Sequence, residues 1–211
     1  MAIYLIVAIV AYAIGSISFS VIISKKMAGF DVREKGSGNA GSTNMLRSVG
    51  KKAALITLIC DILKGVVAIL LALLIGKLNP KVNGAILIQL AAFFVVVGHT
   101  FPIFFEFRGG KGVATSLGVI LLVNWEIGLI CLVFALVLMI LTRIVSLGSI
   151  AAAILFPVLT IFINECYIVE GNYIIFGILM AAFITYNHRS NIKRLLEGKE
   201  NKISFKKTEK V

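Results

Sequence analysis

Long hydrophobic stretches separated by short polar segments dominate this chain. Each stretch has the length of a membrane-spanning helix or of a shorter helix buried among others. One helix over 113–142 would be about 45 Å long, against a hydrocarbon core of about 30 Å, so the polar residues 124–126 are expected to divide it. The predicted helices cover residues 2–24, 53–76, 84–105, 113–124, 127–142, 144–163 and 172–186. This pattern predicts an all-α integral membrane protein with about seven transmembrane helices in a single polytopic domain, 1–211.

Composition supports this fold class. Of the 211 residues, 59% are hydrophobic and 15% charged, and the mean hydropathy is +1.01, values that exclude a soluble protein built on a parallel sheet. The cysteines are too few and too scattered for a disulfide framework, so we expect Cys60, Cys131 and Cys166 to be packing residues. No Cys/His spacing resembles a zinc site, and neither a metal nor a cofactor is expected.

The distribution of basic residues predicts the orientation. All but three of the 21 Lys and Arg residues lie in the segments 25–52 and 106–112, at Arg143, or in the tail from 187. Basic connections face the cytoplasm, so seven spans require an external N-terminus and an external connection over 164–171. A six-span arrangement would leave the basic tail outside. In the seven-span arrangement one cytoplasmic site can be shared by the polar segments 36–50, 98–115 and 186–198.

The first polar segment contains the letters of a dinucleotide-binding fingerprint, GSGNAG. We reject that interpretation because a membrane span precedes the run, whereas the fingerprint needs a strand within a βαβ unit. Glycines nevertheless let backbone N–H groups converge on an anion, and Arg47 can offer phosphate a bidentate fork. A plain glycine-rich turn between spans is the alternative. The candidate anion ligands are Gly36, Ser37, Gly38, Asn39, Gly41, Thr43, Asn44 and Arg47.

The second polar segment places a lysine among glycines at the start of an apolar helix, a layout that favours anion binding. Its alternatives are a positive-inside anchor for Lys111 and a helix-capping role for His99. The phenylalanines at 101, 104, 105 and 107 are expected to form an interfacial belt, and they could also flank an acyl chain. The candidate ligands are His99, Gly109, Gly110, Lys111 and Gly112.

The third polar segment continues as a basic helix in which His188 and Asn191 share one face. The basic residues after them are expected to contact anionic lipid. Inside the second span, Asp61 and Lys64 are one turn apart, and ionisable residues at such depth are usually functional or paired. We expect an ion pair there and leave open whether it is structural or catalytic.

Taken together, these motifs resemble the bacterial acyl-phosphate-dependent glycerol-3-phosphate acyltransferase family, PlsY. The resemblance covers essentially the whole chain and rests on GSGNAGSTNMLRSVG (36–50), DILKG (61–65), GHTFPIFFEFRGGKGVAT (98–115) and NHRSNIKRLLEG (187–198). It implies transfer of a fatty acyl group from acyl phosphate to the 1-hydroxyl of sn-glycerol 3-phosphate at the bacterial cytoplasmic membrane, giving lysophosphatidate and phosphate. The implied polar pocket comprises Ser37, Thr43, Asn44, Arg47, Lys111, His188 and Asn191.

The chemistry of the residues is compatible with direct transfer. Acyl phosphate is already activated, so the protein mainly has to align two anions and an alkyl chain. The sequence has no H-x-x-x-x-D and no G-x-S-x-G motif, which argues against a covalent acyl-enzyme. We expect Ser37, Arg47, Lys111 and His188 to be catalytic. A substrate phosphate is favoured as the base, because a histidine beside two cations is expected to donate to phosphate rather than abstract a proton.

The implied partners are acyl phosphate, glycerol 3-phosphate and membrane lipid, with no nucleic acid. A soluble enzyme that produces acyl phosphate is a candidate partner at the cytoplasmic face. The alternative function is an organic-phosphate transporter that uses the same cations as a cytoplasmic vestibule. It would need matching donors on the outer side, where the connections are short and comparatively acidic.

Overall fold

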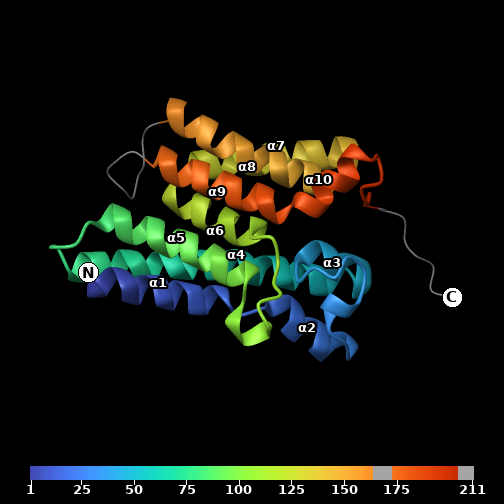
Figure 1. Ribbon diagram of the computed structural model, residues 1–211, viewed down its shortest axis with the longest axis horizontal. Coiled ribbons are helices and arrows are strands. Elements are labelled where there is room, and N and C mark those ends of the chain that lie inside the picture. Colours follow the sequence, from blue (N-terminus) through green and yellow to red (C-terminus); the bar gives the residue numbers. More distant parts are fainter. Residues whose placement is uncertain (164–172, 204–211) are drawn as a thin grey trace.

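The computed structural model describes residues 1–163 and 173–203, and every regular element in these residues is helical (Figure 1). The prediction of an all-α fold is confirmed. Cys166 and the predicted external connection 164–171 lie outside the described residues. The helices are α1 (Ala2–Gly15), α2 (Phe19–Ala28), η1 (Val32–Glu34), α3 (Ser42–Ser48), α4 (Lys51–Leu78), α5 (Gly84–Thr100), η2 (Ile103–Phe105), α6 (Val113–Val123), α7 (Trp125–Thr142), α8 (Val145–Phe162), α9 (Ile174–Asn187) and α10 (Arg189–Leu196).

Five stretches of the described chain are long and apolar enough to cross a membrane. They are Ala2–Ala28, Lys51–Leu78, Gly84–Phe105, Trp125–Thr142 and Val145–Phe162. The helices α6 and α9 are also apolar but shorter. The protein is therefore a multi-pass membrane protein, and the crossing of all seven predicted spans stays a prediction.

Two predicted helices differ from the structure: α5 ends at Thr100 and not at 105, and the first span is not a continuous helix over 2–24. The chain leaves helical geometry between α1 and α2, and there the ammonium group of Lys64 donates hydrogen bonds to backbone carbonyls. Lys64 Nζ donates to the carbonyl oxygens of Gly15 at 2.9 Å and Ile17 at 3.0 Å. Hydropathy could not reveal this break, because it depends on a side chain from another helix.

The predicted ion pair on α4 is confirmed. Lys64 Nζ lies 3.0 Å from Asp61 Oδ1, and both side chains are buried. The same carboxylate oxygen lies 3.5 Å from His99 Nδ1 on α5. This cluster therefore joins α4 to α5 and to the α1–α2 break, which supports a structural role for the pair.

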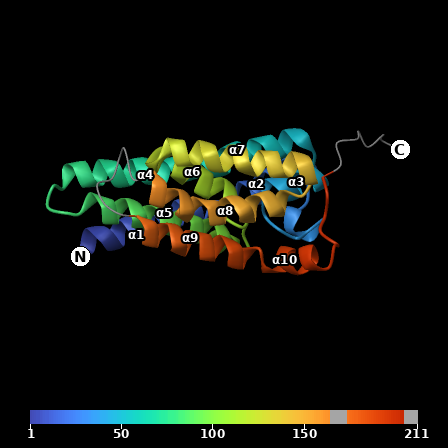
Figure 2. The same cartoon turned by 90° about the horizontal axis from the view of Figure 1, so that it is seen from above.

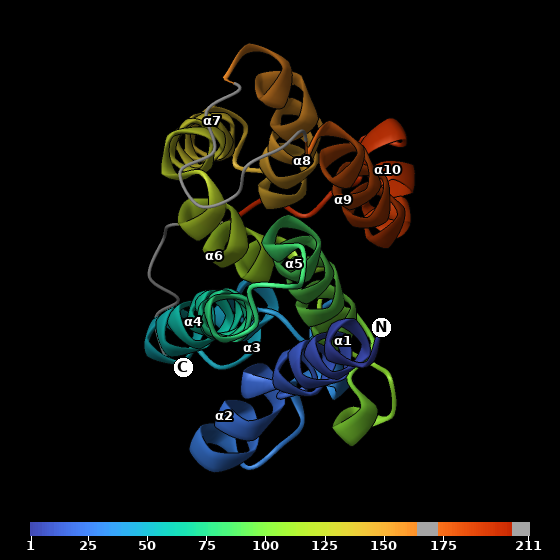
Figure 3. The same ribbon diagram turned by 90° about the vertical axis from the view of Figure 1, so that its left-hand side faces the viewer.

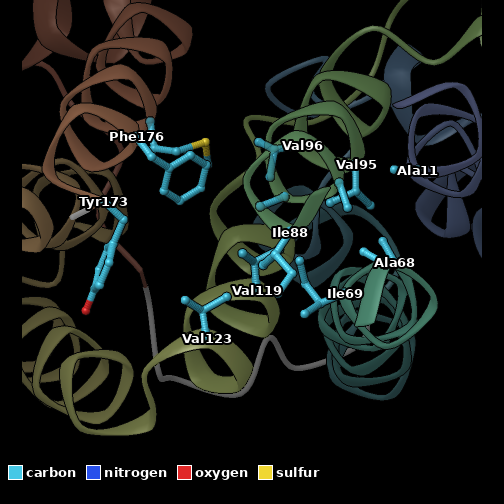
Figure 4. Packing of buried hydrophobic residues seen from close by; sticks show 14 of the residues in the cluster. Ala11, Ala68, Ile69, Ile88, Val95, Val96, Val119, Val123, Tyr173 and Phe176 are labelled. Atoms are coloured by element: carbon cyan, nitrogen blue, oxygen red, sulfur yellow. The ribbon is translucent and has the colours of Figure 1, made fainter. Parts of the chain in front are cut away.

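The helices form two groups with α6 between them (Figures 2 and 3). One group contains α1, α4 and α5, and the other contains α7, α8 and α9. Glycines bring α4 and α6 into backbone contact, because a Cβ added at Gly118 would lie 2.1 Å from the carbonyl oxygen of Ile62 and one at Gly65 2.4 Å from that of Thr115. The apolar core is centred on α5 and includes side chains of α1, α4, α6 and α9, with further residues from α7 and α8 (Figure 4).

The predicted break after α6 is also confirmed. Asn124 ends α6 and caps α7, with its Oδ1 accepting a hydrogen bond from the backbone N–H of Ile127 at 3.0 Å. Trp125, the first residue of α7, is half exposed. Segments α3, α10 and the loop before α6 lie together at one end of the bundle, while the N-terminus and the α4–α5 connection lie at the other (Figure 1).

Candidate active site

A cavity of about 610 Å³ lies where the three polar segments meet. Its polar end is formed by α3 with the loop before it, by the residues that begin α6, and by α10. A long apolar part extends from this end between α4, α6, α7, α8 and α9. The apolar lining includes Leu58, Ile62, Leu117, Ile120, Leu132 and Met139.

The candidate residues divide into two sets by position. Those that line the cavity are Ser37, Asn39, Gly41, Thr43, Asn44, Arg47, Lys111, His188 and Asn191. Those that do not are Gly36, Gly38, His99, Gly109, Gly110 and Gly112. The structure thus brings residues of all three motifs to one cavity, while most of the candidate glycines do not line it.

Asn44 organises the loop that carries Ser37. The residue is only 1% exposed, and its Oδ1 accepts a hydrogen bond from the backbone N–H of Ser37 at 2.9 Å. The two hydrogens of Nδ2 are shared among three backbone carbonyls at 2.9–3.0 Å, those of Val32, Lys35 and Asn39. Because its donors are engaged in this way, Asn44 shapes the loop, whereas the sequence suggested that it would contact a ligand.

The glycines of the second motif close the chain back onto α5. The backbone N–H of Gly109 donates to the carbonyl of Thr100 at 3.1 Å, and that of Gly110 to the carbonyl of His99 at 3.0 Å. A Cβ at Gly110 would lie 2.1 Å from His99 Nε2, so only glycine allows this approach. These N–H groups therefore hold the loop before α6 against the end of α5. Neither they nor His99 line the cavity, whereas the sequence predicted that these residues bind a ligand.

Two residues that the sequence analysis did not single out fasten the first motif to the second. Arg33 forms an ion pair with Asp31 at 2.9 Å and donates from Nη1 to the carbonyl of Phe105 at 2.6 Å. Ala40 adds a backbone hydrogen bond to the carbonyl of Gly109 at 3.3 Å. In the sequence, Arg33 is one more basic residue of a connection that is predicted to be cytoplasmic, and only the fold reveals its partners.

Glu200 was also missed, and it organises the third motif. Its Oε1 accepts hydrogen bonds from Asn191 Nδ2 at 2.6 Å and from Ser146 Oγ at 3.0 Å, while Oε2 pairs with Arg194 Nε at 2.7 Å. Lys111 Nζ donates in turn to Asn191 Oδ1. Burial by itself raises the pKa of Glu200, but these hydrogen bonds outweigh it and hold the pKa below its ordinary value.

Positive charge gathers at the polar end of the cavity. The pKa of Lys111 is lowered to about 8, mainly by burial and also by the neighbouring cations Arg194 and Arg47, against the attraction of Glu200. Burial also lowers the pKa of Arg47, although a guanidinium remains charged in proteins. An anion that entered here would relieve this repulsion, so the arrangement favours the binding of phosphate.

His188 faces the same cavity as a neutral ring. Its Nδ1 lies 2.8 Å from the carbonyl oxygen of Ile184, which can only accept, so Nδ1 carries the hydrogen. The pKa of His188 is lowered to about 4, mainly by burial and also by the charge of Lys111, against the hydrogen bond to Ile184 and the attraction of Glu200. In the neutral ring Nε2 therefore offers a lone pair, and this arrangement disagrees with the expectation that the histidine would donate to phosphate.

Known proteins with similar sequences share one description. Residues 5–198 match a family model described as glycerol-3-phosphate acyltransferase. A glycerol-3-phosphate acyltransferase from Clostridioides difficile (strain 630) is 45% identical over 208 residues, which cover 97% of each chain. One from Thermoanaerobacter sp. (strain X514) is 45% identical over 200 residues, covering 94% of this chain and 95% of the relative.

Two solved structures have the same fold, both of PlsY, an integral membrane glycerol 3-phosphate acyltransferase. The glycerol 3-phosphate form has 37% sequence identity and a TM-score of 0.82, with 95% of this chain and 96% of that chain covered. The lysophosphatidic acid form has 36% identity and a TM-score of 0.80, with 95% of both chains covered. The similarity therefore extends over nearly the whole bundle.

Proposed function

Because this chain belongs to the glycerol-3-phosphate acyltransferase family, we propose that it transfers a fatty acyl group from acyl phosphate to the 1-hydroxyl of sn-glycerol 3-phosphate. Family membership makes the protein a membrane-embedded acyltransferase, and the proposal adds the donor and the details of the reaction. The observation that carries it is one cavity with a cationic polar end and a long apolar part. Such a cavity suits a phosphate joined to an alkyl chain, and a second phosphate beside it.

In this proposal the polar end and the apolar part of the cavity hold different parts of the substrates. Arg47 presents a planar fork and Lys111 a point charge, and together they bind and align the phosphates. The apolar part takes the acyl chain, whose burial supplies binding energy. Ser37, in the loop before α3, lines the cavity and donates a hydrogen bond to a phosphate oxygen. Bringing the two anions together against their repulsion is the main contribution of these groups.

The transfer itself needs no covalent enzyme intermediate. The 1-hydroxyl oxygen attacks the acyl carbonyl carbon, a new carbon–oxygen ester bond forms, and the bond between that carbon and the phosphate oxygen breaks. Inorganic phosphate leaves, and one of the substrate phosphate oxygens takes the hydroxyl proton. His188, a weak base with a pKa of about 4, accepts a hydrogen bond at Nε2 from the 2-hydroxyl of glycerol 3-phosphate, and this contact orients the 1-hydroxyl for attack while its own hydrogen faces phosphate.

The orientation in the membrane is part of the proposal. We infer that α6 and α9 also cross the bilayer, although they are short, because both are apolar and pack against longer helices, α6 against α4 and α7 and α9 against α8. The motif-bearing end of the bundle then faces the cytoplasm of a bacterial cell, in line with its basic residues. There a soluble enzyme that makes acyl phosphate could deliver the donor directly.

One assay tests the function against its alternative. Purified protein in detergent, given acyl phosphate and radiolabelled glycerol 3-phosphate, is expected to form labelled lysophosphatidate and one phosphate per product. An organic-phosphate transporter would form no product in this assay. It would instead move labelled glycerol 3-phosphate across proteoliposomes without an acyl donor, and that result would contradict the proposal.

A further inference from the structure

The apolar part of the cavity has a defined deep end on α8. Among the residues that line it, Val145 begins this helix near the polar end, and Phe156 lies 11 positions further along. At 1.5 Å per residue this separation corresponds to about 16 Å. Phe156 is only 3% exposed, so its ring is enclosed by neighbouring helices.

A second aromatic ring holds Phe156 in place. Phe176 on α9 packs edge to face against it, with ring centroids 6.3 Å apart and an interplanar angle of 84°. The two helices approach closely at this level, because a Cβ at Gly177 would lie 3.3 Å from Pro157 Cα and 3.6 Å from Phe156 Cε1. The ring at the deep end is therefore supported by its surroundings and cannot swing aside without disturbing them.

Behind this pair of rings the packing is incomplete. A separate small cavity of about 10 Å³ lies on the far side, lined by Phe176 and Tyr173 together with side chains of α5 and α6. Figure 4 shows the side chain of Phe176 on the side of α9 that faces these helices. Phe156 lines the main cavity and Phe176 lines the small one, so these two rings in contact separate the cavities, and a smaller residue at position 156 would extend the main cavity as far as the ring of Phe176.

We propose that Phe156 sets the length of acyl chain that the protein accepts, an inference that rests on the proposed function. A chain of single bonds advances roughly 1.2 Å per bond when extended, as three bonds of an extended backbone span about 3.5 Å. The apolar part is then filled by about a dozen bonds, and the end of the chain meets the ring of Phe156. Longer chains have to bend or displace the ring, which lowers their kcat/KM.

The test compares acyl phosphates of about 12 to 20 carbons with each protein and reports the ratio of kcat/KM for long and short donors. Phe156→Ala and the milder Phe156→Leu are expected to raise the long-to-short ratio, by about tenfold for alanine. Ala153→Leu, one turn nearer the polar end and also in the lining, is expected to lower it. Phe134→Ala is the matched control, since this residue is 40% exposed on α7 and absent from the lining.

The outcomes separate this inference from the proposed function. A wild-type protein that forms no lysophosphatidate from any donor would overturn the proposed function. Wild-type turnover with an unchanged ratio in Phe156→Leu and Ala153→Leu would overturn the role of Phe156 alone. These two variants decide the matter even where Phe156→Ala fails to fold, because leucine preserves most of the packing at the first position and adds a side chain to a lined space at the second.

Discussion

The ammonium group of Lys111 donates a hydrogen bond to Oδ1 of Asn191, a residue 80 positions later in the chain. This contact joins the loop before α6 to the helix α10. The other side of the same amide donates to Glu200. The position of the lysine is therefore set by a chain of polar groups, and a substrate phosphate that binds Lys111 acts on the third motif at the same time.

Arg47 is expected to require its guanidinium group, beyond its charge. Arg47→Lys keeps the charge but loses the bidentate fork, so kcat/KM should fall by about ten- to a hundredfold, equivalent to roughly 1.5–3 kcal/mol. Lys111→Ala should lower kcat/KM at least as much. Steady-state kinetics with both substrates provides the measurement.

The double variant decides whether these two cations act on the same anions. If they do, the combined loss should be clearly smaller than the product of the single losses. Simple multiplication of the two effects, or near-normal kcat/KM in Arg47→Lys, would remove the basis for a shared phosphate site.

The activity should have a pH window set by Lys111 and His188. The pKa of Lys111 is lowered to about 8, so the ammonium is present below that pH and phosphate binding weakens as pH rises through it. The pKa of His188 is about 4, and protonation below it removes the Nε2 acceptor. We expect kcat/KM to decline on both sides of this range.

Lys111→Arg is the control for the alkaline decline. An arginine stays charged, so the decline near pH 8 should disappear even where the absolute rate is reduced. The ionisation of the substrates is the same in both proteins and cancels in the comparison. Retention of the same alkaline midpoint in Lys111→Arg would assign that titration to another group.

Glu200 is expected to stabilise the folded site. Glu200→Gln keeps the shape of the side chain but replaces the carboxylate that pairs with Arg194 and accepts a hydrogen bond from Asn191. The loss of these charged hydrogen bonds should lower the free energy of unfolding by roughly 1.5–3 kcal/mol. The thermal midpoint in detergent should fall accordingly. Glu197→Gln is the matched control, because its ion pair with Lys199 is exposed and should matter little. Equal midpoints for the two variants would contradict the role of Glu200.

The buried pair on α4 should be needed as a pair. Lys64→Met leaves Asp61 buried without its ammonium partner and removes the hydrogen-bond donor from the carbonyls at the α1–α2 break. The free energy of unfolding should therefore fall by about 3–5 kcal/mol. Lys77→Met, at the exposed end of the same helix, is the control. The double variant Asp61→Asn with Lys64→Met should be more stable than Lys64→Met alone, and the reverse order would argue against an uncompensated charge.

The proposed topology can be tested by cysteine labelling in intact cells. On a background with Cys60, Cys131 and Cys166 replaced by alanine, which should retain activity, an impermeant thiol reagent is expected to label Lys81→Cys from outside. Ser190→Cys, at an exposed position on α10, should react only after permeabilisation. Labelling of Ser190→Cys in sealed cells would invert the proposed orientation.

Hydropathy and motif spacing alone were sufficient for the helical fold and for the choice of polar segments. The division at Asn124 followed from helix length against membrane thickness, and the Asp61–Lys64 pair followed from its depth within a span. These are local properties, because a membrane imposes the same requirements on every hydrophobic stretch wherever it packs.

Tertiary structure decided what each polar residue contacts. The sequence could not separate Asn44, whose amide group is engaged by its own loop, from Arg47, which presents its charge to the cavity, since both belong to one donor-rich motif. Nor could it assign Glu200 to the site or the α1–α2 break to Lys64, because these contacts join residues far apart in sequence. Hydrogen bonds need particular atoms at short range, and only the packing of the helices brings those atoms together.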